Sequence, residues 1–197
     1  TLLNTNDLIL QTFNYTLKEI LGITVPQEQI FATYGRPLQE IMAEFDAERA
    51  DLLLTTYRAY NAQIHDEYVT LFDQVEETLA ALKDNGLKLS VVTSKKSDIA
   101  WHGLAHFHLE HYFDAFVGPE DTAEHKPAAA PALEALKRLG CTPDTAIMVP
   151  YDILCGQRAG CQTAAVRYSV HALQELEALH PTFMLNTLAD LLPIVTA

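Results

Sequence analysis

Basic residues are scarce in this sequence. Its 197 residues include 13 Lys and Arg against 26 Asp and Glu, which gives a formal net charge of −13. A protein that binds nucleic acid needs clustered Lys and Arg to neutralise phosphate groups. Long hydrophobic runs are missing too, because no apolar stretch approaches the roughly 20 residues that cross a membrane. The sequence therefore predicts neither a nucleic acid nor a membrane as its partner.

Cysteine is scarce as well. The sequence holds only Cys141, Cys155 and Cys161, an odd number, and it contains no C-x-x-C pair. Neither a disulfide scaffold nor a zinc motif is indicated by this spacing. We expect free thiols in a reducing compartment and predict a cytoplasmic protein. Hydrophobic residues make up 49% and charged residues 20%, which is typical of a folded globular chain.

The first third of the sequence has the pattern of consecutive helices. Apolar residues recur three and four positions apart, as Leu10, Phe13, Leu17 and Leu21 do. Gly22 and Gly35 are typical helix stops, and Pro26 and Pro37 are typical of a first helical turn. The pattern predicts an all-helical unit without strands, with helices over 6–22, 26–35, 37–45 and 47–72. His65 and Asp66 are expected on a solvated face of the last of these helices.

After Asp73 the pattern changes to short apolar strands that alternate with helices. Strands are predicted over 87–93, 114–118, 145–149, 161–166 and 183–185, with helices over 74–86, 97–107, 127–140, 151–160 and 186–195. Such alternation predicts an α/β fold with a parallel sheet covered on both faces, because parallel neighbours need crossover connections. Ligands of open α/β sheets bind beyond the carboxyl ends of the strands. The residues at those ends are therefore the candidate site.

Three polar residues follow successive predicted strands. Thr93 and Ser94 end one strand and lead into a helix, where a hydroxyl and free backbone N–H groups favour an anion. Lys126 lies in a loop ahead of a helix and offers a compact positive charge. Asp152 lies where a loop becomes a helix and is suited to a hard cation such as Mg²⁺. Each residue also has an ordinary explanation: Ser94 or Ser97 as a helix N-cap, Lys126 as a solvated lysine, Asp152 as another N-cap.

The order of Thr93, Lys126 and Asp152 resembles the second, third and fourth motifs of the haloacid dehalogenase (HAD) phosphohydrolases. The opening TLLNTNDLI resembles the residues that follow the nucleophile in the family's first motif, D-x-D-G-T-L, and YGRPLQEI resembles a cap segment of the phosphoglycolate phosphatases. The chain is similar to the phosphoglycolate phosphatase and pyrophosphatase branch. The resemblance implies a Rossmann-like core over 1–5 and 75–197, with a helical cap over 6–74 inserted after the first motif.

The resemblance also implies a mechanism. In that family a carboxylate attacks phosphorus to form an aspartyl-phosphate, and Mg²⁺ neutralises charge. Thr93 and Ser94 would then hold phosphate oxygens, Lys126 would offset negative charge, and Asp152 would belong to the metal-binding motif. Arg36, in the cap loop, would contact a second anionic group of the substrate. The alternative for Arg36 is a surface residue beside a helix start.

The sequence departs from the family at two places. Thr1 corresponds to the T of D-x-D-G-T, and Val149 is followed directly by Pro150 where the family reads V-G-D-x-x-x-D-I. Omitted residues, a deliberate deletion and a naturally inactive relative would each explain this. Loss of the first strand would leave buried sheet edges unpaired, which a natural protein is not expected to tolerate. We expect the gene to encode D-x-D-G before Thr1 and Gly-Asp-Ser after Val149, and the 197-residue polypeptide alone to be inactive.

The predicted function is Mg²⁺-dependent hydrolysis of a small phosphomonoester of the phosphoglycolate type. A pyrophosphatase or a sugar-phosphate mutase of the same family is the enzymatic alternative, and a phosphate-binding relative without turnover is the non-enzymatic one. The expected partner is a small phosphorylated molecule, and the expected assembly is a monomer or a homodimer.

Overall fold

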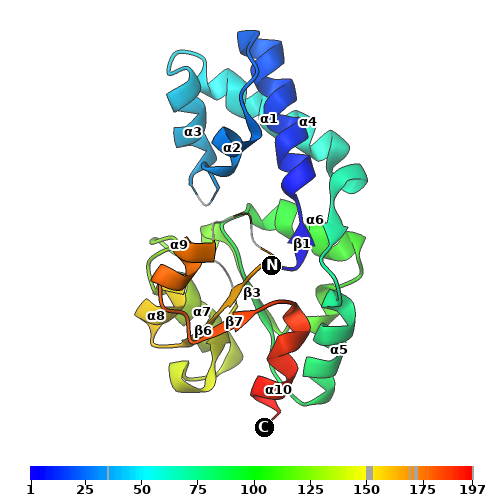
Figure 1. The fold of residues 1–197 in the computed structure, drawn as a ribbon, viewed down its shortest axis with the longest axis vertical. Coiled ribbons are helices and arrows are strands. Elements are labelled where there is room, and N and C mark those ends of the chain that lie inside the picture. The colour runs from blue at the N-terminus through cyan, green and yellow to red at the C-terminus, as the bar shows by residue number, and fades with distance from the viewer. Residues whose placement is uncertain (35, 150–152, 169, 171–172, 197) are drawn as a thin grey trace. The chain divides into compact units, whose positions relative to one another are not determined.

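The computed structural model describes residues 1–34, 36–149, 153–168, 170 and 173–196. The chain divides into two compact units, one formed by residues 3–70 and the other by residues 1–2 and 71–197. Figure 1 labels the helices and strands of both units. Among the described helices, none is both long enough and apolar enough to cross a membrane.

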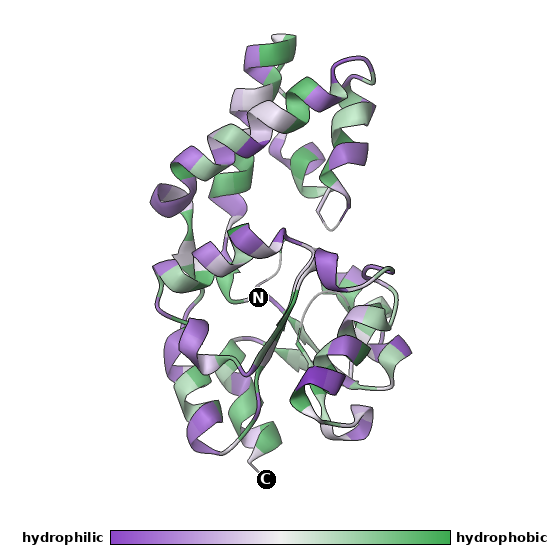
Figure 2. Ribbon diagram, turned by 180° about the vertical axis from the view of Figure 1, so that it is seen from behind, coloured by the Kyte–Doolittle hydropathy of each residue, from purple (hydrophilic) through white to green (hydrophobic). Residues whose placement is uncertain are grey.

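The 3–70 unit is built from amphipathic helices. Its elements are β1 (Leu3–Asn4), α1 (Asn6–Leu21), α2 (Gln27–Phe31), α3 (Leu38–Phe45), α4 (Ala50–Tyr68) and the strand β2 (Thr70–Leu71), which pairs with β1. Helices α1 and α4 pack along each other. Figure 2 shows apolar and polar residues alternating along these helices, and the apolar ones meet in a core that includes the fully buried Leu17 and Met42. Burial of this apolar face stabilises the unit.

Helix α1 ends as its sequence predicts. Gly22 takes the left-handed conformation with a φ of 70°, and its N–H group contacts the carbonyl oxygens of Leu17 and Lys18. A glycine at this position satisfies the last carbonyls of a helix without the steric cost that a side chain would add.

The second unit alternates helices with short parallel strands. Its elements are α5 (Val75–Asp84), β3 (Ser90–Val92), α6 (Ser97–His106), β4 (Ala115–Val117), α7 (Ala130–Leu139), β5 (Ile147–Met148), α8 (Ile153–Ala159), β6 (Gln162–Val166), α9 (Leu173–Ala178), β7 (Phe183–Leu185) and α10 (Leu192–Val195). Single 3₁₀ turns cover Glu110–Tyr112, Pro119–Asp121, Pro143–Thr145 and Leu188–Leu191.

The described strands of this unit form two parallel sheets. Strand β3 pairs with β4, with Ser90 opposite Ala115, and the second sheet has the order β5-β6-β7. Helix α7 packs on β3 and β4, and α8 packs on β5 and β6. Four consecutive residues of β6, Thr163 to Val166, are buried, as expected for a strand of a covered parallel sheet. The predicted α/β class with parallel strands is confirmed.

Several local predictions were wrong. Helix α4 ends at Tyr68 rather than at Phe72, and β2 follows inside the range that was predicted to be all-helical. The range 171–180, where no helix was predicted, contains α9. His65 is buried, with 2% of its surface exposed, and its Nδ1 lies 2.8 Å from Asp66 Oδ1. Periodicity placed His65 on the wrong face because α4 also buries polar side chains, Asn61 among them.

Candidate active site

Thr93 lies immediately after β3, at the carboxyl end of the strand. Its backbone N–H donates to the carbonyl oxygen of Val117 at 2.9 Å, which continues the β3–β4 ladder by one residue. Its Oγ1 accepts a hydrogen bond from the backbone N–H of Lys95 at 3.0 Å. Because the hydroxyl oxygen is used as an acceptor, the O–H group can donate outward. Thr93 is thus a fixed hydrogen-bond donor at the strand end.

The start of α6 does not fit the expectation that Ser94 or Ser97 is a helix N-cap. Lys96 occupies the N-cap position, so neither Ser94 nor Ser97 caps the helix. The backbone N–H of Ser97 faces Glu120 Oε1 at 3.4 Å, and that of Ile99 donates to Asp98 Oδ1 at 2.9 Å. The prediction of free helix N–H groups is therefore wrong at these two positions. Ser94 is exposed, and its N–H donates to no atom of the described residues, so the turn itself keeps a donor for an anion.

Lys126 comes together with Thr93 as the motif order predicts. Its Nζ donates to the carbonyl oxygen of Val92 at 3.3 Å, and Val92 directly precedes Thr93. The side chain is half-buried. The loop that leads to α7 therefore brings a positive charge to the carboxyl end of β3. A hydroxyl donor and an ammonium group at one strand end form an arrangement suited to a phosphate.

Lys95 is a second cation at this turn, and sequence reasoning did not single it out. It stands between the hydroxyl residues of the turn and α6 and is half-buried. Burial lowers the pKa of the Lys95 ammonium group, because removing a charge from water disfavours the charged form. The run of two lysines after Thr93 and Ser94 was the signal that could have marked it.

Asp152, the predicted Mg²⁺ ligand, lies outside the described residues. Among the described residues, the carboxylates of Glu120 and Asp121 that follow β4 bind Ser97 and Arg138. An oxygen donor such as Asp152 fits Mg²⁺ by its chemistry, since Mg²⁺ is bound in proteins by one or two carboxylates. In the sequence, Asp152 follows β5 by four residues and directly precedes α8, which is the position that the resemblance assigns to a metal-binding motif.

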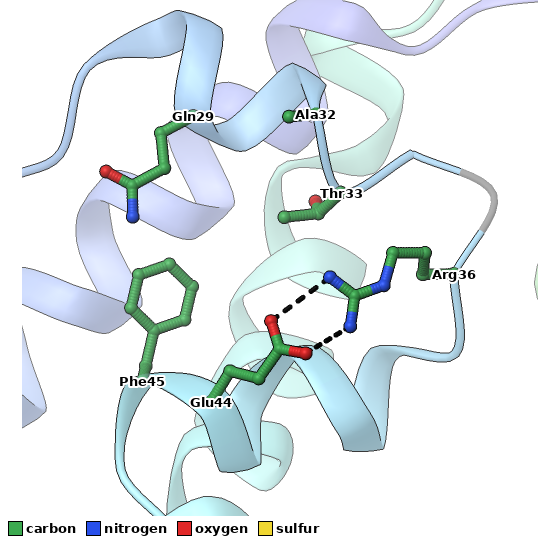
Figure 3. A pocket seen from close by; sticks show the side chains of 6 residues that line it. All are labelled: Gln29, Ala32, Thr33, Arg36, Glu44 and Phe45. Atoms are coloured by element: carbon green, nitrogen blue, oxygen red, sulfur yellow. Dashed lines mark hydrogen bonds and ion pairs between the residues drawn. The ribbon is translucent and has the colours of Figure 1, made fainter.

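Arg36 lies in the 3–70 unit and lines a pocket of about 360 Å³ with Gln29, Ala32, Thr33, Glu44 and Phe45. Figure 3 shows its guanidinium group facing the Glu44 carboxylate through two hydrogen bonds, one of 3.1 Å and one from Nη2 to Oε1. This bidentate contact lowers the pKa of Glu44 and raises that of Arg36. Arg36 is therefore an exposed residue just before α3, as the alternative expected, and its guanidinium group is already paired with Glu44.

Comparison with known proteins identifies a family. A family model described as haloacid dehalogenase-like hydrolase matches residues 1–166. A protein of Clostridium perfringens named "Putative pyrophosphatase PpaX" is 42% identical over 99% of this chain and 92% of its own length. The pyrophosphatase PpaX of Bacillus velezensis is 38% identical over 98% of this chain and 91% of its own length.

Solved structures share the fold. A haloacid dehalogenase-like family hydrolase from Streptococcus pneumoniae superposes with a TM-score of 0.87 at 24% identity, covering 98% of this chain and 93% of the other. A structure from Haemophilus somnus described as a predicted phosphoglycolate phosphatase gives a TM-score of 0.87 at 23% identity, with the same coverage of 98% and 93%.

Proposed function

Because the chain belongs to the haloacid dehalogenase-like hydrolase family and is accordingly a phosphatase, we propose that it releases phosphate from a small phosphorylated compound in a Mg²⁺-dependent reaction. The observation that carries the proposal is the meeting of two motif residues. Lys126 Nζ lies 3.3 Å from the carbonyl oxygen of the residue before Thr93. Because Thr93 and Lys126 lie on different loops, their local sequences alone do not require them to meet at one strand end.

Each of these residues has a defined task in the proposed reaction. The Thr93 hydroxyl and the Ser94 N–H group would donate to oxygens of the phosphoryl group and orient it. The Lys126 ammonium would offset the negative charge on the phosphoryl group and its attacking carboxylate. Fixed donors and charges of this kind account for most of the catalysis in phosphoryl transfer, because there is little covalent chemistry for the protein to assist.

The covalent steps follow the course that the family resemblance implies. A carboxylate of the first motif would attack phosphorus while the bond from phosphorus to the leaving-group oxygen breaks. Water would then hydrolyse the aspartyl-phosphate and release inorganic phosphate. Asp152 would hold Mg²⁺, which when bound neutralises charge between the carboxylates and the phosphoryl group.

Two substrates have specific support. Relatives that are 36–42% identical carry the name pyrophosphatase PpaX, which favours inorganic pyrophosphate. The sequence resemblance to phosphoglycolate phosphatases favours phosphoglycolate. Both molecules have a second anionic group beside the phosphoryl group that is transferred, and Arg36 is suited to bind such a group. We therefore propose a substrate with two anionic groups and rank pyrophosphate first.

The test is a phosphate-release assay on the full-length protein with Mg²⁺ and with pyrophosphate, phosphoglycolate and sugar phosphates as substrates. Replacing Lys126 by Ala should lower kcat/KM by about 10²–10³-fold, the usual effect of losing one group that stabilises transition-state charge. Removal of the metal with EDTA should abolish turnover, and added Mg²⁺ should restore it.

Lys137→Ala is the matched control, because Lys137 is an exposed lysine of α7 that pairs only with Glu134 among the described residues, at 3.3 Å. Its activity should equal that of the wild type. Unchanged rates in Lys126→Ala would remove Lys126 from the site. Phosphate binding without turnover of any substrate would favour the non-catalytic alternative.

A further inference from the structure

A carboxylate from another loop occupies the start of α6. Ser97 is the first residue of this helix, and its Oγ donates to Glu120 Oε2 at 2.6 Å while its backbone N–H faces Glu120 Oε1 at 3.4 Å. One carboxylate thus contacts both the side chain and the main chain of a single residue. The Ser97 hydroxyl lowers the pKa of Glu120, so this group is ionised at neutral pH. A negative charge is also favourable at the N-terminus of a helix.

The contact depends on a residue without a side chain. A Cβ atom placed on Gly118 would overlap the Ser97 Oγ and would lie 2.9 Å from Glu120 Oε2. A side chain at 118 would therefore force the Ser97 hydroxyl and the Glu120 carboxylate out of their present contact. The close approach of the Gly118–Glu120 segment to α6 is built into the sequence.

The loop that carries Glu120 is held from its other side. Asp121 accepts a hydrogen bond from the Gly118 N–H at 2.7 Å and forms an ion pair with Arg138 at 2.6 Å. Arg138, on α7, also donates to the carbonyl oxygen of Phe116 in β4 at 2.5 Å. The backbone beside Glu120 is therefore tied to both a strand and a helix, while the exposed Glu120 side chain contacts Ser97.

Two proposed site residues lie on the segments that this contact joins. Thr93 stands four positions before Ser97, and Lys126 stands six positions after Glu120. From these contacts we propose that Glu120 is a positioning residue, which fixes the Thr93–Lys96 turn against the loop of Lys126 by holding Ser97. The inference rests on the proposed function. By occupying the N–H group of Ser97, Glu120 also directs an incoming phosphate to the turn itself.

The decisive comparison uses two carboxylates at opposite ends of the same strands. Asp114 precedes β4 and contacts Lys83 Nζ at 2.7 Å and the N–H of Leu89, the residue before β3, at 2.8 Å. It therefore joins segments at the amino ends of β3 and β4, as Glu120 joins segments at the carboxyl ends. Asp114→Ala is the matched control for Glu120→Ala in the full-length protein.

We expect Glu120→Ala to lower kcat by about ten- to a hundredfold, the scale of a small misplacement of catalytic groups, with KM within about twofold. Glu120→Gln keeps an acceptor for the Ser97 hydroxyl and should recover most of kcat. The dissociation constant of orthovanadate, which takes the geometry of the transferred phosphoryl group, should rise by the same factor as kcat falls. Asp114→Ala should lower the melting temperature comparably while kcat stays within twofold of the wild type.

A kcat within twofold of the wild type in Glu120→Ala would overturn the inference, as would an equal loss of kcat in Asp114→Ala. If Glu120→Ala does not fold, Ser97→Ala removes the shorter of the two contacts, from the Ser97 hydroxyl to Glu120, and is interpreted in the same way. A wild-type protein that binds orthovanadate but hydrolyses no substrate would sink the proposed function alone, and vanadate affinity would then decide on Glu120. A wild-type protein that neither binds orthovanadate nor hydrolyses any substrate would overturn both the proposed function and the inference about Glu120.

Discussion

At the scale of single residues, Arg36 shows how a neighbour can set the strength of a binding group. Its guanidinium is engaged by Glu44 through two parallel hydrogen bonds, and the Glu44 carboxylate stays ionised because the contact lowers its pKa. An anion that binds Arg36 in the same bidentate way has to displace Glu44. If Arg36 binds the second anionic group of the substrate, as proposed above, the Glu44 carboxylate would compete with that group.

Replacing Glu44 by Gln should make Arg36 a better anion site. We expect KM to fall severalfold for pyrophosphate or phosphoglycolate and to stay constant for a phosphomonoester without a second anion. Steady-state kinetics with both kinds of substrate measure this difference. Glu40→Gln is the control, since Glu40 acts on Arg36 only through its charge and makes no hydrogen bond with it. Equal changes of KM for both substrates would remove Arg36 from substrate selection.

The sequence identified Thr93 and Lys126 as candidates because each follows a strand in the order that a known family uses. It did not identify Glu120, since the contact between residues 97 and 120 leaves no local pattern in the chain. The sequence did not indicate a role for Gly118 either, because the overlap that a side chain at this position would cause exists only in the folded protein. Candidate site residues could thus be named where a motif exists, but not where a long-range contact determines the arrangement.

At the scale of elements, helix α8 depends on Gly156 to approach its sheet. A Cβ at this position would lie 2.7 Å from Thr163 Cγ2 and 2.9 Å from Met148 Cβ, in β6 and β5 respectively. Helical glycine is normally a cost of about 1 kcal/mol relative to alanine. Here the missing side chain is what lets the helix and the strands pack.

Gly156→Ala should therefore destabilise the protein. Overpacking destabilises a core by about 1–3 kcal/mol, whereas the higher helix propensity of alanine over glycine stabilises by about 1 kcal/mol. We expect the overpacking to dominate at this position. Urea unfolding of the wild type and of a series with Ala, Ser and Val at position 156 measures the effect, and stability should fall with side-chain size. A stabilised alanine variant would show that α8 moves aside freely.

Long periodic helices were the elements that sequence predicted best. Helices α1 and α6 begin at the predicted residues. The apolar stripe of each helix and the glycine or loop beside it define where the helix can lie in the sequence. Strand β7 matches its predicted range of 183–185, whereas β3 to β6 are shorter than predicted, as β5 covers only Ile147–Met148 of the range 145–149. Strand β2 and the 3₁₀ turns were missed, since two or three residues carry no period.

At the scale of the whole molecule, acidic groups dominate the charge, and many of them are held ionised by cations. Lys83 lowers the pKa of Asp114, and Arg138 lowers that of Asp121 through hydrogen bonds. A carboxyl group with a lowered folded-state pKa stabilises the fold fully above its ordinary value of 3.8. That contribution is lost as the pH falls through the lower folded-state value.

Stability should consequently be nearly constant between neutral pH and about pH 5 and should decline below about pH 4. Urea unfolding at a series of pH values measures the curve. Asp114→Asn should flatten it, because the variant has no carboxyl group to protonate at that position. A variant curve parallel to that of the wild type throughout would show that Asp114 contributes nothing to acid sensitivity.

The pairing of β1 with β2 sets the two ends of the helical unit next to each other. Residues Leu3 and Asn4 lie beside Thr70 and Leu71, and on the other side of this boundary the N–H of Phe72 donates to the carbonyl oxygen of Leu2 at 3.1 Å. A segment whose ends are adjacent can be lengthened, shortened or replaced at little entropic cost to the rest of the chain. The helical unit can therefore change in length or sequence while the chain path of the α/β unit is kept.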